Sequence, residues 1–141
     1  MERKSIEELS AEVVDEFSVF EEWLDKYEYI IELGKTLPLI DESDRKEENL
    51  IAGCQSRVWL SCRMEDGLLR FRADSDAIIT KGIISLLIRV YDGQKPEDIV
   101  ASDFSFIEKI GLRENLSPTR AGGLTAMIKQ IKLYAIGYGA K

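Results

Sequence analysis

Residues 57–74, "RVWLSCRMEDGLLRFRAD", determine the fold class of this 141-residue chain. Apolar and polar side chains alternate on both sides of Asp66-Gly67, a pair that favours a tight two-residue turn. The pattern therefore predicts an antiparallel hairpin with strands over residues 57–65 and 68–74. Each strand has one aliphatic face for a core and one face rich in arginine.

Helical patterns flank the hairpin on both sides. They predict helices over residues 5–20, 21–33, 76–91, 104–110 and 118–136, and a short helix after the turn in "DGQKPEDI". Ser5, Ser75 and Ser117 are the expected N-caps of the first, third and last of the long helices, and Gly34 is the expected C′ residue of the second. In the buried helix over residues 76–91, Gly82 would allow another element to approach closely.

The predicted order is two helices, two strands and then four helices. This order indicates an α+β fold in which a small antiparallel sheet packs against helices. The length suits one domain over residues 1–141, and the sequence has no internal repeat or linker.

The charge and composition exclude several classes of function. The net charge of −7 argues against nucleic acid as a partner, because phosphate binding needs a concentrated basic surface. Histidine is absent, which removes the usual general base and the commonest zinc ligand. Apolar residues 77–91 contain Lys81 and Arg89 and are too few for a membrane span. With two cysteines and no signal peptide pattern, we expect a cytoplasmic protein without membrane contact.

The two cysteines, Cys54 and Cys62, have different surroundings. Cys62 shares a strand face with Val58, Leu60 and Met64, which predicts a small buried hydrophobe. Cys54 follows a glycine in the polar loop "AGCQS", where packing has no need of sulfur. The local sequence leaves open whether this thiol is reactive or accidental.

The spacing of the cysteines excludes several kinds of site. No CxxC dithiol is present, and a metal site needs about four ligands, of which this chain offers two thiols and no imidazole. A cysteine hydrolase lacks its imidazole base. What remains is chemistry in which sulfur itself is the cargo or the adduct.

Two further segments have both a structural and a functional interpretation. In "SPTRAGGL", residues 117–124, two glycines occupy a predicted helix, where each lowers helix propensity by about 1 kcal/mol relative to alanine. Either the backbone packs tightly there, or the loop of Cys54 approaches, with Arg120 and the helix N-terminus near the thiolate. In "ADSDAI", residues 73–78, the acids either cap a helix or face a partner.

Four ordered blocks of the chain resemble the SufE-type sulfur acceptor family, which includes CsdE. The blocks are "YIIELGKTLP", "EENLIAGCQSRVWL", "DSDAIITKGIISLLIRVYDGQKPEDI" and "IGLRENLSPTRAGGLTAMIKQI". The resemblance runs from about Tyr27 to Ala135, and "GCQS" followed by "VWL" is its most specific part. It implies an α+β domain similar to the IscU scaffold.

The resemblance also implies a function and its residues. Such proteins bind a pyridoxal-phosphate cysteine desulfurase, of the SufS or CsdA type, and accept its persulfide sulfur on the GCQS cysteine. They deliver the sulfur to an iron–sulfur scaffold complex, as carriers with no cofactor rather than as stand-alone enzymes. Carried over to this chain, the acceptor is Cys54. The other implied residues are Gly53, Gln55 and Ser56 in the loop, Arg120 as polar neighbour, and Asp74 and Asp76 near the desulfurase contact.

The sequence departs from the family pattern at three positions. Thr119 and Gly122 stand where serine and asparagine are common in "SPSRxNGL", and Arg57 replaces a frequent glutamine beside the acceptor loop. Two other functions are compatible with the same fold. One is a non-catalytic adaptor that regulates a desulfurase, and the other is an iron–sulfur scaffold, for which two cysteines are few.

Overall fold

The computed structural model describes residues 3–139 and has the predicted α+β architecture, with one two-stranded antiparallel sheet. Its elements are α1 (Ile6–Ser18), α2 (Trp23–Gly34), the 3₁₀ turns η1 (Glu42–Asp44) and η2 (Glu47–Asn49), β1 (Val58–Glu65), β2 (Leu68–Ser75), α3 (Ile78–Tyr91), α4 (Pro96–Ala101), α5 (Phe106–Lys109), α6 (Leu112–Asn115) and α7 (Pro118–Gly137). Of the three expected serine N-caps, those at Ser5 and Ser117 are present.

The hairpin forms at the predicted place and in the predicted register. Val58 lies opposite Ser75, and Glu65 lies opposite Leu68. Asp66 and Gly67 both have positive φ, 54° and 80°, as the central residues of a type I′ turn require. The tight turn therefore fixes which side chains of β1 and β2 face the core.

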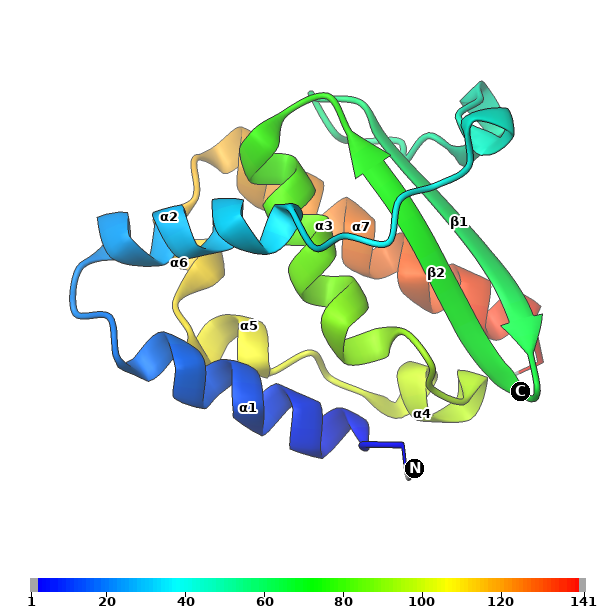
Figure 1. The fold of residues 1–141 in the computed structure, drawn as a ribbon, viewed down its shortest axis with the longest axis horizontal. Helices are drawn as coiled ribbons and strands as arrows, with labels where there is room; N and C mark the ends of the chain where they lie inside the picture. The colour runs from blue at the N-terminus through cyan, green and yellow to red at the C-terminus, as the bar shows by residue number, and fades with distance from the viewer. Residues whose placement is uncertain (1–2, 140–141) are drawn as a thin grey trace.

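Helix α3 is the centre of the fold. It packs against β2, α1, α2 and α7, and in Figure 1 it runs between the hairpin and the N-terminal helices. Eleven of its residues are buried, which explains why its sequence is apolar on nearly every side. The first turns of α3 and α7 lie at the end of the molecule where β1 begins (Figure 1).

The crossing of α2 and α3 depends on two glycines in contact. A Cβ on Gly82 would lie 2.2 Å from the carbonyl oxygen of Ile30, and a Cβ on Gly34 would lie 3.1 Å from the backbone nitrogen of Gly82. The hydroxyl of Ser85 donates to the carbonyl of Leu33 at 2.8 Å. The close approach expected at Gly82 is confirmed. Gly34, however, is the buried last residue of α2 and not its C′ residue, because α3 requires the space.

Two predicted helix ends were wrong. Helix α3 begins at Ile78 with Ala77 as N-cap, because Ser75 is still part of β2, paired with Val58, and its hydroxyl accepts the N–H of Ala77 rather than one inside the helix. Helix α5 is restricted to Phe106–Lys109 because Phe104 has a φ of 57°, outside the helical region. Among residues 3–139, no helix combines the length and the apolar character needed to cross a membrane.

Candidate functional site

The loop that carries Cys54 has a firmly bonded base. The backbone N–H of Ile51 donates to the carbonyl of Val58 at 2.9 Å. At Arg57, the N–H donates to Oδ1 of Asp76 at 3.1 Å, and the carbonyl accepts from the hydroxyl of Ser75 at 2.7 Å. Residues 52–56, which we call the loop tip, therefore project from a fixed base.

Gly53 gives the loop tip its shape. Its φ of 93° lies in the region that favours glycine, and a Cβ there would also lie 3.3 Å from Cβ of Ala126 in α7. The backbone thus turns against α7 at the residue before Cys54.

The thiol of Cys54 rests against the start of α7. Its Sγ lies 3.6 Å from the carbonyl oxygen of Gly123 in hydrogen-bonding geometry, and a Cβ on Gly123 would lie 3.5 Å from Sγ. The residue is partly buried at the margin of the core. Of the two glycines in "AGG", Gly123 meets the loop, whereas nothing lies within 4 Å of a Cβ built on Gly122.

A cavity of about 100 Å³ opens beside Cys54. The loop tip contributes Cys54, Gln55 and Ser56, α3 contributes Thr80 and Ile83, and α7 contributes Thr119, Arg120, Gly123 and Met127. Thr80, Thr119 and Arg120 come from the first turns of α3 and α7, where the helix dipole favours negative charge. The structure therefore brings Cys54, Gln55 and Ser56 together with Arg120 around one small cavity, whereas Gly53 does not line it.

Electrostatics at the thiol are dominated by burial. Burial raises the pKa of Cys54 above its usual value, so the resting thiol is protonated at neutral pH. Arg120 lines the same cavity, but its guanidinium donates to the hydroxyl of Tyr27 at 3.0 Å and lies 5.9 Å from the centroid of that ring. In this conformation Arg120 is thus directed to Tyr27, and its action on the sulfur remains a prediction.

The two candidate acids, Asp74 and Asp76, lie in different environments. Asp74 is 6% exposed and forms ion pairs with Arg45 and with Lys81, the latter at 3.4 Å. Asp76 is exposed and accepts the N–H of Arg57 at the loop base. Of the two, Asp76 is the one whose side chain a partner can reach in this conformation, and Asp74 acts within the fold.

Cys62 is less deeply buried than its strand face predicts. Val58 and Leu60 are fully buried, but Cys62 is only partly buried and Met64 is 38% exposed. The reason is that β1 leaves the core towards its C-terminal end. Burial and the nearby carboxylate of Asp92 raise the pKa of Cys62 to about 12.

These environments predict unequal reactivity of the two thiols. Since the thiolate is the nucleophile, alkylation by iodoacetamide should accelerate as pH rises towards the pKa of each thiol. The pKa of Cys62, about 12, leaves almost no thiolate at pH 8. We expect Cys54 to be labelled first across pH 7–9, as measured by peptide mass spectrometry of timed samples. Equal labelling rates would contradict the assignment.

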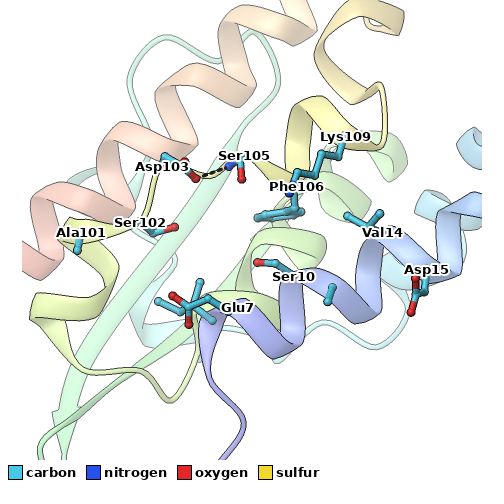
Figure 2. A pocket seen from close by; sticks show the side chains of 12 residues that line it. Glu7, Ser10, Val14, Asp15, Ala101, Ser102, Asp103, Ser105, Phe106 and Lys109 are labelled. Atoms are coloured by element: carbon cyan, nitrogen blue, oxygen red, sulfur yellow. Dashed lines mark hydrogen bonds between the residues drawn. The ribbon is translucent and has the colours of Figure 1, made fainter.

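A larger cavity, of about 500 Å³, lies elsewhere in the molecule. Figure 2 shows side chains of α1, including Glu7 and Ser10, facing Asp103, Phe106 and Lys109 of the segment around α5. In Figure 1 this region is at the lower edge, whereas the start of β1 is at the upper edge. Its lining residues include no thiol. It therefore contributes nothing to sulfur chemistry at Cys54.

Several residues of the site were missed by sequence reasoning. Thr80, Ile83 and Met127 line the cavity of Cys54, and Tyr27 binds Arg120. Ile83 and Met127 have ordinary apolar spacing, which gives no signal of a site. Thr80 is the exception, because it places a hydroxyl beside Lys81 in "AIITKGII", whose other residues are apolar or glycine.

Comparison with protein families matches residues 11–135 to the SufE family, described as a domain associated with Fe–S metabolism. An uncharacterized SufE-like protein of Rhizobium meliloti is 41% identical over 131 residues, covering 89% of this chain and 94% of the relative. An uncharacterized SufE-like protein of Rhizobium etli is 41% identical over 126 residues, covering 86% and 85%.

Among solved structures, the chain is similar to the solution structure of a hypothetical protein from Thermus thermophilus. The TM-score is 0.76 at 20% identity, with 92% of this chain and 94% of the other covered. At that identity the likeness concerns the fold alone. It agrees with the α+β class predicted from the hairpin.

Proposed function

The chain belongs to the SufE family, which is associated with Fe–S metabolism, and on that basis we propose that it accepts sulfur from a cysteine desulfurase on Cys54. The observation that carries the proposal is the thiol on a projecting loop tip, beside a small cavity lined by residues of α3 and α7. A carrier must expose its sulfur to a partner and shelter it afterwards. The arrangement around Cys54 provides both.

The transfer step requires no oxidant. The Cys54 thiol loses its proton, and the thiolate attacks the terminal sulfur of the partner's persulfide. A sulfur–sulfur bond to Cys54 forms while the sulfur–sulfur bond in the partner breaks, and the partner's cysteine leaves as a thiolate. The total number of electrons on sulfur is unchanged, so the reaction is a transfer of sulfane sulfur between two cysteines.

We propose that the loop tip moves during transfer. At rest, burial raises the pKa of Cys54 and holds the thiol in its unreactive form. Within residues 3–139, the Sγ makes one hydrogen bond, the weak contact with Gly123 at 3.6 Å, whereas the loop base is held by several bonds to Val58, Ser75 and Asp76. Residues 52–56 can therefore swing out towards a desulfurase while the base stays in place.

The surface around the loop tip is the proposed contact for the desulfurase. Gln55, Arg57 and Asp76 are exposed there, and Ile78 at the start of α3 is 69% exposed. Such a mixture of an apolar anchor and polar rim suits a transient protein interface. From this contact the sulfur would continue to an iron–sulfur scaffold complex.

The test is the rate of alanine formation by a pyridoxal-phosphate cysteine desulfurase from the same host, with cysteine as substrate. We expect the rate to rise several-fold when this protein is added and to saturate with its concentration, because removal of the persulfide frees the desulfurase for another turnover. A rate that does not change at saturating concentrations of this protein would contradict the proposal.

A further inference from the structure

Thr80 is a buried polar residue in the wall of the Cys54 cavity. It lies in the first turn of α3, is 8% exposed, and lines the cavity beside Ile83. Its hydroxyl is found in no hydrogen bond with residues 3–139, unlike that of Thr125, which donates to the carbonyl of Ala121 at 3.2 Å. A buried hydroxyl in a helix usually makes such a bond.

The Thr80 hydroxyl is not sealed inside the core. Across the described chain, every side-chain oxygen or nitrogen that is fully enclosed has a hydrogen-bond partner. An unpartnered hydroxyl at Thr80 must therefore touch open space, and the space that this residue lines is the cavity. The cavity thus presents a free hydroxyl on its inner wall.

The cavity has room for a transferred sulfur. Its volume is about 100 Å³, whereas a water molecule occupies about 30 Å³ in the liquid. A sulfur added to Cys54 extends the side chain by one atom, and a persulfide is more acidic than its parent thiol, so the terminal atom carries negative charge. Negative charge in a partly buried site requires hydrogen-bond donors or positive potential.

We propose that Thr80 is a positioning residue that donates a hydrogen bond to the terminal sulfur carried by Cys54. The inference rests on the proposed function and deepens it by identifying the donor on the buried side of the cavity. The N-terminus of α3, which is the positive end of its helix dipole, lies at the same wall of the cavity. Besides Cys54, the ionisable residue lining the cavity is Arg120, which stands at the exposed rim and binds Tyr27.

The test measures the pKa of the persulfide in a Cys62→Ser background, so that Cys54 is the one thiol. Cys54 is first converted to a mixed disulfide with thionitrobenzoate. Hydrosulfide then displaces the thionitrobenzoate, which is counted by its absorbance, and leaves the persulfide on Cys54. The rate of trapping by monobromobimane as a function of pH gives the apparent pKa of the terminal sulfur.

We expect Thr80→Val, which removes the hydroxyl at nearly constant volume, to raise this pKa by about one unit, the size expected for a hydrogen bond to a charged group. Thr80→Ser should restore the parental value. Thr119→Val is the matched control, because Thr119 lines the same cavity but is exposed, so water replaces its hydroxyl.

An unchanged pKa in Thr80→Val, or a serine variant that behaves like the valine variant, would overturn the inference. A parent protein that cannot be loaded at Cys54 would overturn it too, because the cavity would then admit no added sulfur. Chemical loading uses no desulfurase. Failure of the proposed function is therefore seen separately: the protein would not raise the rate of alanine formation by the desulfurase, while the persulfide pKa would still change as expected in Thr80→Val.

Discussion

Replacement of Cys54 by serine is expected to reduce alanine formation to the rate of the desulfurase alone. Serine has almost the same shape as cysteine, so the loop tip should keep its contact with Gly123. Its hydroxyl cannot form a persulfide, and the sulfur would stay on the desulfurase. The loss should therefore be complete rather than partial, with binding to the desulfurase retained.

The control for this variant is Cys62→Ser. Cys62 is also partly buried, but its pKa is raised to about 12 and its carbonyl is bound by the hydroxyl of Tyr138, so it is a structural residue. We expect this variant to raise the rate of alanine formation by the desulfurase as much as the parent protein does. If Cys54→Ser still stimulates fully, the protein is a regulatory adaptor and not a sulfur acceptor.

Gly82→Ala is expected to have the largest effect on stability. The new methyl group would lie 2.2 Å from the carbonyl oxygen of Ile30 and 2.8 Å from its carbonyl carbon. These are backbone atoms and cannot rotate away, so α2 must separate from α3. Overpacking of this kind should cost about 3 kcal/mol or more, a large part of the roughly 5–15 kcal/mol that typically stabilises a domain.

The matched control is Gly122→Ala in α7. A Cβ at this position meets nothing within 4 Å, and the residue is exposed. The same substitution should here increase the free energy of unfolding by up to about 1 kcal/mol, because alanine has the higher helix propensity. Urea denaturation of both variants measures the difference. Equal stabilities would contradict the contact assigned to Gly82.

The features predictable from the sequence are those with a local signal. Alternation around Asp66-Gly67 predicted the hairpin, its turn and its register, and all three are present. The apolar run of α3 predicted a buried helix with a close contact at Gly82. In these places a residue's own backbone or side-chain preference agrees with its tertiary role, so local rules suffice.

Several features set by long-range contacts were missed. Ser75 has the residue type of an N-cap, yet its hydroxyl bonds to Arg57, 18 positions earlier in the chain. Gly34 resembles a helix terminator but serves the crossing with α3. The cavity of Cys54 joins three segments distant in sequence, so its wall residue Thr80 has no partner that a local pattern can reveal.

The central claim is that sulfur from a desulfurase is transferred to Cys54. The most direct test is to incubate the protein with a cysteine desulfurase and cysteine, without reductant, and then to measure its intact mass and map the modified peptide. We predict a gain of one sulfur atom, located at Cys54, removable by dithiothreitol and absent from Cys54→Ser. A sulfur that is found on Cys62, or that Cys54→Ser still acquires, would contradict the account.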